Sequence, residues 1–298
     1  MVLSVRLEVG AEPLPGYQLC QFLGRGSWGV VWKATKPNGN PIALKFLNCE
    51  STQAAAQEIR ALQAVRQLRH PNLIRIEQVW CHLGYVIIGM ELAEGSLLDL
   101  LDVYLTEFGV PFVAEHVCHY LTQIAAALDF LNTRQHNLGG TRVALRHCDV
   151  KPSNLLLFGE TAKLADFSVA TQSTSQDWYH RRAGTLDFIA PEVFQGRLTD
   201  RTDQYALAVT YCQLRGNRLP FTNTPSTFQS DYVRPQPDLT MLSPPERPIV
   251  ARALAPVPHD RWPSCVEMMN RLTKCTAEST KKPGPAGLGS RVRTGAKR

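Results

Sequence analysis

The stretch His147-Cys148-Asp149-Val150-Lys151-Pro152-Ser153-Asn154 places an imidazole, a carboxylate, an ammonium group and a carboxamide within eight residues. A carboxylate can accept a hydroxyl proton, and a lysine two residues later can neutralise a phosphoryl group. An amide oxygen three residues further on can hold a divalent cation. A second carboxylate, Asp166, follows twelve residues after Asn154 and precedes Phe167 and Ser168. The combination predicts a loop that handles phosphate groups.

A glycine-rich turn, Gly24-Arg25-Gly26-Ser27-Trp28-Gly29, lies between two segments with the composition of strands, 17–23 and 30–34. Glycines at this spacing let the backbone approach phosphate oxygens and expose N–H donors to them. A dinucleotide-binding fold needs a helix directly after such a turn. Here β-branched Val30 and Val31 continue as a strand towards a hairpin turn at 37–40, which favours a strand-turn-strand unit instead.

Two more motifs flank the loop, in a fixed order. Ile42-Ala43-Leu44-Lys45 is a strand with a lysine at its end, and Ala190-Pro191-Glu192 follows a segment rich in Ser, Thr and Arg after Asp166. In this order and spacing the motifs resemble those of the catalytic core of a eukaryotic-type protein kinase. The resemblance extends over about Tyr17 to Cys275.

The resemblance implies an α+β, bilobal fold. Its N-lobe, about 17–92, would be a small antiparallel β-sheet with one key helix over 53–69, and its C-lobe, about 93–275, would be mainly helical. Apolar periodicity places strands at 73–78 and 85–90 and helices at 97–105, 114–132 and 205–214. Residues 133–143 are expected to be an inserted exposed loop. An N-terminal extension, 1–16, contains a possible short edge strand, and 276–298 form a basic flexible tail.

Composition narrows the class of protein. The chain has 298 residues, 44% of them hydrophobic, and its eight cysteines are scattered without a C-x-x-C pair. That spacing argues against a zinc site or a disulfide framework, and a reduced, cytoplasmic compartment fits best. No apolar run suits a signal peptide or the roughly 20 residues of a membrane-spanning helix.

The net charge of +6 comes from the end of the chain. From Lys274 to Arg298 there are seven basic residues and one acidic residue, while the rest of the chain is balanced. A nucleic-acid surface on the folded part is therefore not indicated. The tail is interpreted as a solvated terminus, with electrostatic contact to acidic lipid or a linker into a further segment as alternatives.

The resemblance also implies ATP and Mg²⁺ as cofactors and assigns residues to them. Asp149 would orient the substrate hydroxyl and Lys151 would contact the γ-phosphoryl group, while Asn154 and Asp166 would hold Mg²⁺. The nucleotide would be bound by residues of the glycine-rich turn, the lysine strand and its ion-pair partner, the hinge and the pocket floor: Leu23, Gly24, Gly26, Ser27, Trp28, Gly29, Val31, Ala43, Lys45, Glu58, Glu91, Ala93 and Leu156.

Three further residues receive structural roles from the same resemblance. Met90 would guard the back of the adenine pocket, and His147 would orient the loop by packing against Phe167. Arg261 would pair with Glu192.

Two positions depart from the family motifs: Cys148 replaces an arginine and Ser168 replaces a glycine. Neither removes a side-chain contact to phosphate, metal or proton, yet they keep a nucleotide-binding pseudokinase acting as a scaffold open as an alternative. A small-molecule kinase of related fold is a third class, which usually lacks the full glycine turn and the A-P-E segment. Lys151, two residues after Asp149, resembles Ser/Thr-specific kinases, so the expected partners are proteins with Ser or Thr hydroxyls.

Overall fold

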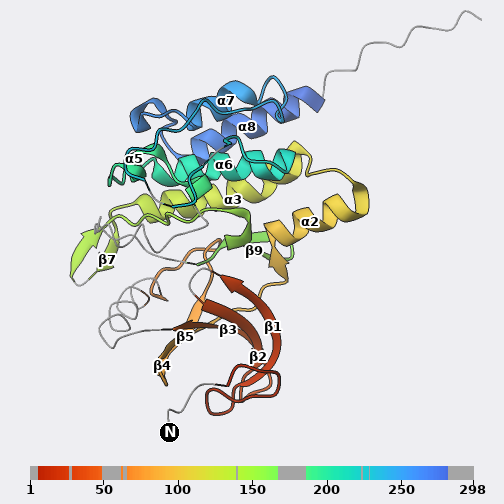
Figure 1. Ribbon diagram of the computed structural model, residues 1–298, viewed down its shortest axis with the longest axis vertical. Helices are drawn as coiled ribbons and strands as arrows, with labels where there is room; N and C mark the ends of the chain where they lie inside the picture. Colours follow the sequence, from red (N-terminus) through yellow and green to blue (C-terminus); the bar gives the residue numbers. More distant parts are fainter. Residues whose placement is uncertain are drawn as a thin grey trace, which may run out of the picture.

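The computed structural model describes residues 6–26, 29–48, 62, 66–138, 140–166, 186–222, 224–227 and 229–280. A twisted β-sheet forms one end of the molecule, and the helices that follow residue 97 form the other (Figure 1). The predicted α+β fold, with an antiparallel sheet followed by a mainly helical part, is confirmed.

The large sheet has five strands in the order β1-β2-β3-β5-β4, and every neighbouring pair is antiparallel. The strands are β1 (Gln18–Gly26), β2 (Gly29–Thr35), β3 (Pro41–Asn48), β4 (Ile76–His82) and β5 (Tyr85–Met90). The predicted strand at 73–78 was misplaced, because β4 starts only at Ile76. Leu73 pairs in parallel with Leu164, and the N–H of Ile74 donates to the Leu164 carbonyl oxygen at 2.9 Å. A contact with a distant segment therefore takes the first residues out of the strand.

The side chains of β3 alternate between the two faces of the sheet, as the period of a strand requires. Ile42, Leu44 and Phe46 pack in a cluster on the outer face. Ala43 and Lys45 consequently lie on the opposite face, and the register places Val31 of β2 directly beside Lys45. The predicted nucleotide-binding residues of these two strands thus share the face turned towards the rest of the chain.

The described part of the N-terminal extension covers the outer face of the sheet. Leu14 is buried in the outer cluster, and Leu7 and Ala11 pack against it. The main chain is tied to β1 by a hydrogen bond from Gly10 N–H to the Leu19 carbonyl oxygen at 2.8 Å. Residues 8–10 form a bend and a turn, so the edge strand suggested by the alternation is absent from the described residues 7–9.

Helices and short strands make up the remainder of the described chain. The helices are α2 (Leu97–Phe108), α3 (Ala114–Asn132), α5 (Pro191–Phe194), α6 (Thr202–Gly216), α7 (Arg247–Ala253) and α8 (Cys265–Thr280). Three short 3₁₀ turns accompany them: η1 (Pro152–Asn154), η2 (Leu186–Phe188) and η3 (Pro258–Asp260). The small strands are β6 (Gly95–Ser96), β7 (His136–Leu138), β8 (Thr141–Val143), β9 (Leu155–Phe158) and β10 (Thr161–Leu164).

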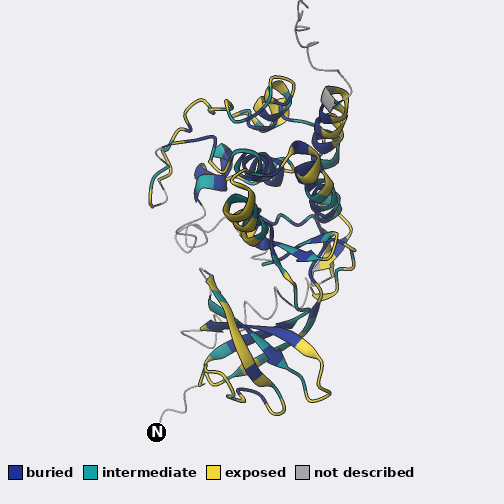
Figure 2. Cartoon of the chain, turned by 90° about the vertical axis from the view of Figure 1, so that its right-hand side faces the viewer, coloured by how far each residue is buried: buried dark blue, intermediate teal, exposed yellow. Residues whose placement is uncertain are grey.

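The predicted helices at 97–105, 114–132 and 205–214 agree closely with these bounds, whereas most of the helix predicted over 53–69 lies outside the described residues. Helix α3 has the predicted limits, and α2 starts at Leu97 because Ser96 and Asp99 form a reciprocal capping box. Helix α6 is buried along nearly its whole length, as its apolar run predicts (Figure 2). It lies in the middle of the helical part, and its buried side chains pack in the larger hydrophobic cluster with residues of the surrounding segments (Figure 1).

The prediction for 133–143 was wrong in part. Strands β7 and β8 pair as an antiparallel hairpin in place of a structureless loop. His136 is buried, with its Nε2 2.9 Å from the Phe130 carbonyl oxygen and its ring against the Phe130 ring. Contacts with the end of α3 therefore order the insertion, which a loop composition does not reveal.

Two hydrophobic clusters hold the described residues together. The larger is continuous from the inner face of the sheet through α2, α3 and α6 to α8, and the smaller is the outer cluster. The seven described cysteines are free thiols. Among the described helices there is none with the length and apolarity that a membrane crossing demands.

Candidate active site

Helix α6 holds the loop 147–154 through hydrogen bonds to its main chain. Asp203, in the first turn of α6, accepts hydrogen bonds from the main-chain N–H groups of His147 (2.8 Å) and Cys148 (2.7 Å). Cys148 has a φ of 62°, a left-handed conformation that costs energy for any residue with a Cβ. The carboxylate of Asp203, only 1% exposed, offsets this cost and fixes the loop that presents Asp149.

Asp149 sits among groups from its own loop. The side-chain amide of Asn154 donates to both the carbonyl oxygen and Oδ2 of Asp149, each at 2.8 Å. Lys151 Nζ forms an ion pair with Asp149 Oδ1 at 3.1 Å, and this oxygen has no other polar partner within the described chain. Because Asn154 uses its amide nitrogen in this way, its carbonyl oxygen Oδ1 stays on the other side as a candidate ligand.

His147 connects this loop to the segment that carries Asp166. Its Nδ1 accepts from the Asp149 N–H at 3.3 Å, which makes Nε2 the protonated nitrogen and the donor to the Ala165 carbonyl oxygen at 3.0 Å. The imidazole therefore has the predicted structural role of orienting the loop. Its expected neighbour Phe167 lies outside the described residues.

Lys45 and Asp166 bridge the sheet and the helical part. Lys45 is buried, with 6% of the residue exposed. Its ammonium group donates to Asp166 Oδ1 in an ion pair. Burial alone would raise the pKa of Asp166, but the charge of Lys45 and its hydrogen bond, with a smaller effect from the charge of Lys151, lower it. Asp166 is thus an anion at neutral pH. Glu58, the predicted partner of Lys45, lies outside the described residues.

The segment after β5 has the geometry of a hinge. The Glu91 carboxylate binds Lys163 Nζ at 2.8 Å and accepts from the Arg75 N–H at 2.8 Å, so this side chain ties the two parts together. The main-chain N–H and carbonyl of Ala93 make no hydrogen bond to other described residues. Ala43 pairs with Met90, and half-buried Leu156 pairs with Ser96 beside the hinge.

The glycine-rich turn divides into two kinds of position. Gly29 has a φ of 155°, and a Cβ there would lie 1.9 Å from the Phe46 carbonyl oxygen, so this glycine is required by the close approach of β3. A Cβ at Gly24 would meet nothing, which leaves the space above it open to a ligand. Leu23 is exposed, Gly26 ends β1, and Ser27 and Trp28 lie outside the described residues.

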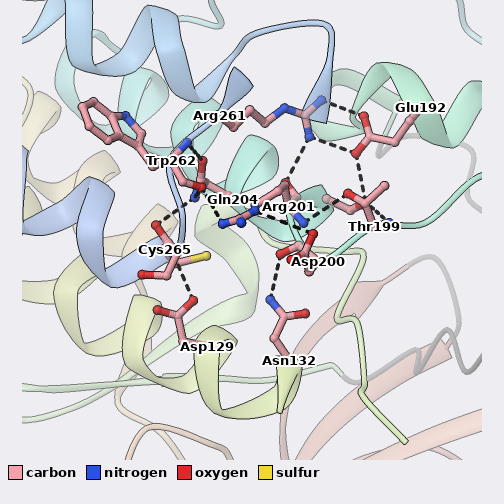
Figure 3. Close-up of polar contacts among 12 residues, drawn as sticks. Asp129, Asn132, Glu192, Thr199, Asp200, Arg201, Gln204, Arg261, Trp262 and Cys265 are labelled. Atoms are coloured by element: carbon pink, nitrogen blue, oxygen red, sulfur yellow. Dashed lines mark hydrogen bonds and ion pairs between the residues drawn. The ribbon is translucent and has the colours of Figure 1, made fainter. Parts of the chain in front are cut away.

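A buried ion pair joins the A-P-E segment to Arg261, the residue that follows η3 (Figure 3). Arg261 Nη1 and Nη2 donate to the two carboxylate oxygens of Glu192 at 2.9 and 2.7 Å. Glu192 also accepts from Thr202 Oγ1 at 2.9 Å, and Arg261 Nη1 reaches the Arg201 carbonyl oxygen at 3.0 Å. The predicted pair is confirmed, and it holds the start of α5 against α6.

Sequence reasoning missed two residues that hold segments of the site in place, Asp203 and Lys163. An aspartate at the head of an almost wholly apolar helix was the one available signal, since a buried carboxylate needs donors. Lys163 occupies a half-buried polar position in the alternating strand β10, and such an alternation does not single out one lysine.

On this α+β fold, Lys45 on the inner face of the sheet pairs with Asp166, and His147 connects the segment of Asp166 to the loop that carries Asp149, Lys151 and Asn154. The chain belongs to the protein kinase family, because the model of the protein kinase domain matches residues 17–275.

Known protein kinases are similar to the chain in sequence. CBL-interacting protein kinase 4 of Oryza sativa subsp. japonica is 31% identical over 266 residues, 84% of this chain and 56% of that protein. Serine/threonine-protein kinase PknF of Mycobacterium tuberculosis is 28% identical over 279 residues, 86% of this chain and 56% of that protein. The chain therefore spans little more than half the length of these relatives.

A solved structure is also similar. The crystal structure of the Mycobacterium tuberculosis PknI kinase domain superimposes with a TM-score of 0.66 at 25% sequence identity. The match covers 91% of this chain and 100% of that one.

Proposed function

We propose that the protein transfers the γ-phosphoryl group of ATP to Ser and Thr hydroxyls of protein substrates. The observation that carries the proposal is the arrangement around Asp149: a buried carboxylate, 3.1 Å from Lys151 and hydrogen-bonded to Asn154, on a loop that Asp203 holds. Membership of the protein kinase family and the Ser/Thr kinases among the relatives support the same reaction.

Asp149 would accept and orient the substrate hydroxyl. Phosphoryl transfer has a loose transition state, so the protein contributes mostly alignment and charge neutralisation. The Asn154 amide fixes Oδ2, which leaves Oδ1 of Asp149 to meet the hydroxyl. Lys151 beside Oδ1 would place a positive charge where negative charge develops on the transferring group.

The chemistry of the donor set fits Mg²⁺ and ATP. Mg²⁺ prefers hard oxygen ligands, which the Asp166 carboxylate and Asn154 Oδ1 supply. The lowered pKa of Asp166 keeps it charged for this purpose. When bound, the metal would neutralise phosphate oxygens. Lys45 would contact the phosphates, and Val31, Ala43 and Leu156 would contact the adenine with the main chain of Glu91 and Ala93.

A nucleotide-binding scaffold without transfer is the second candidate, suggested by Cys148 and Ser168. At position 148 the anchoring contact is made by the main-chain N–H, which is the same for any side chain. The replacement of arginine by cysteine therefore leaves the hold of Asp203 on the loop intact. Ser168 lies outside the described residues.

One experiment separates the two candidates. Wild-type protein is incubated with labelled ATP, Mg²⁺ and dephosphorylated casein, and phosphoserine and phosphothreonine are measured beside Asp149→Asn. Transfer that the substitution abolishes supports the proposal. Thermal stabilisation by Mg-ATP without transfer would support the scaffold. Asp238→Asn, at an exposed carboxylate bound to Arg218, is the matched control and should keep the wild-type rate.

A further inference from the structure

Arg234 is a buried arginine in the segment between α6 and α7, whose described residues form neither helix nor strand. It is 9% exposed. Its Nη2 donates to three carbonyl oxygens, those of Leu186, Asp187 (3.0 Å) and Ile189 (2.8 Å), and Nη1 donates to Thr224 Oγ1 at 3.1 Å. One guanidinium thus binds two carbonyl groups of η2 and the carbonyl group of Ile189, the residue that follows η2.

The charge of Arg234 is stabilised without a carboxylate. Within the described chain it forms no ion pair, and its guanidinium carbon lies 4.9 Å from the ring centre of Phe221, 5.6 Å from Phe194 and 5.7 Å from Tyr232. Three aromatic faces and three carbonyl dipoles together compensate for lost hydration. Such an environment suits a planar guanidinium, whereas a lysine ammonium is a point charge with stronger hydration.

The carbonyl groups held by Arg234 belong to a segment next to the catalytic loop. Phe188, Ile189 and Ala190 line a small hollow together with Cys148 and Asp203. Cys148 directly precedes Asp149. A polypeptide that brings a hydroxyl to Asp149 would therefore run beside residues 186–190.

We propose that Arg234 is a positioning residue for the protein substrate, acting through the segment 186–190. This inference rests on the proposed function. By holding three carbonyl oxygens at once, Arg234 gives the segment a single conformation before the substrate arrives, which lowers the cost of ordering it on binding. Among the described residues, the hydrogen-bond and ring partners of Arg234 include none of the proposed nucleotide-binding residues, so loss of this hold acts on the protein substrate and not on ATP.

The test is a comparison of Arg234→Met and Arg234→Lys with the wild type, using dephosphorylated casein as the substrate. We expect the KM for casein to rise at least about fivefold in Arg234→Met, with the KM for ATP within about twofold of wild type. Arg234→Lys should be intermediate, because it keeps the charge but not the fork. Hydrogen exchange of amides in 186–194 should be faster in both variants.

The matched control is Arg218→Met. Arg218 lies in the same segment, is exposed, and binds Asp238 and Thr240 away from η2, so both KM values and the exchange should stay at wild-type levels. A fall in kcat and melting temperature with an unchanged casein KM in both Arg234 variants would mean a purely structural role and overturn the inference. Absence of transfer in the wild type would overturn the proposed function itself, and the substrate role with it.

Discussion

The carboxylate of Asp203 holds the main chain of Cys148 in a left-handed conformation, with a 2.7 Å hydrogen bond from the Cys148 N–H at a φ of 62°. The same carboxylate binds the His147 N–H at 2.8 Å. A buried aspartate on one helix thereby sets the direction of the peptide that leads into Asp149. The stabilisation from two charge-assisted hydrogen bonds exceeds the roughly 1–2 kcal/mol that the left-handed conformation of Cys148 costs.

Asp203→Asn is the first prediction. The N–H groups of His147 and Cys148 each bind a different oxygen of the Asp203 carboxylate, and an asparagine amide has only one oxygen. The loop should therefore lose its fixed direction. We expect kcat to fall at least about tenfold, roughly 1.4 kcal/mol of barrier, with little change in nucleotide affinity. Steady-state kinetics and ATP binding measure the two effects. The control Asp200→Asn keeps the main-chain carbonyl that binds Asn132 and should retain the rate. Equal rates for both variants would contradict the role of Asp203.

Asp166→Asn should weaken Mg²⁺ far more than metal-free nucleotide. Removal of a charged oxygen ligand affects the metal directly, whereas metal-free nucleotide is affected only through the weakened ion pair between Asp166 and Lys45. The measurement is the Mg²⁺ concentration that gives half-maximal thermal stabilisation by ATP, with nucleotide binding in EDTA as the reference. An unchanged half-saturating concentration would exclude Asp166 as a ligand.

Phosphorylation of the loop between Asp166 and Ala190 should have little influence on the rate. An arginine at position 148 would form a bidentate pair with a loop phosphate, whereas the Cys148 thiol has no positive charge. The variant Ser173→Ala, Thr174→Ala, Ser175→Ala should therefore keep most of the wild-type activity, and phosphatase treatment should change little. A loss of more than about tenfold after either treatment would show that another cation binds the phosphate.

Arg261→Met should destabilise the fold strongly. Glu192 is 2% exposed, and removal of its partner leaves a buried carboxylate with Thr202 as its remaining side-chain donor among the described residues. The loss is expected to be about 3–5 kcal/mol in urea denaturation. Arg271→Met, which breaks an exposed pair with Glu267, should cost less than about 0.5 kcal/mol. Similar values for both variants would contradict the difference in burial.

Glu246 should make the stability depend on pH in the acid range. Burial alone would raise its pKa, but hydrogen bonds from Arg215, Ser243 and Tyr211 lower it from 4.5 to about 2. A lowered native pKa contributes stability that is complete above the ordinary value and is lost as pH falls towards the native one. The free energy of unfolding should therefore decline between pH 4.5 and about 2. Glu246→Gln should be less stable at pH 7 and show a smaller decline; an identical slope in the variant would rule out this carboxylate as its source.

Local pattern was enough for much of the fold. The limits of α3 follow from apolar residues at intervals of three and four, and the strand alternation of β3 explains why Ala43 and Lys45 share a face. The loop 147–154 could be singled out because its chemistry is concentrated in neighbouring residues. In each case the decisive interactions join residues close together in the chain or repeat with a fixed period.

Contacts between distant residues could not be inferred in this way. The start of β4 at Ile76 depends on Leu164, and the order of the hairpin β7–β8 depends on α3. Asn154 and Asp149, which form a hydrogen bond, are only five residues apart in the sequence. The conformation of the loop between them depends on Asp203, which binds the Cys148 N–H from 55 positions away.

The sequence by itself thus determined the family, the limits of α3 and the loop 147–154 as a candidate site, because motif spacing and periodicity are local properties. Only the tertiary structure decided that Lys45 pairs with Asp166 across 121 positions and that Asp203 binds the main chain of the strained Cys148. It also decided that Arg234 donates hydrogen bonds to three carbonyl groups beside the loop 147–154. The physical reason is that the strength of each such contact depends on burial and on the exact approach of groups that only the packed chain brings together.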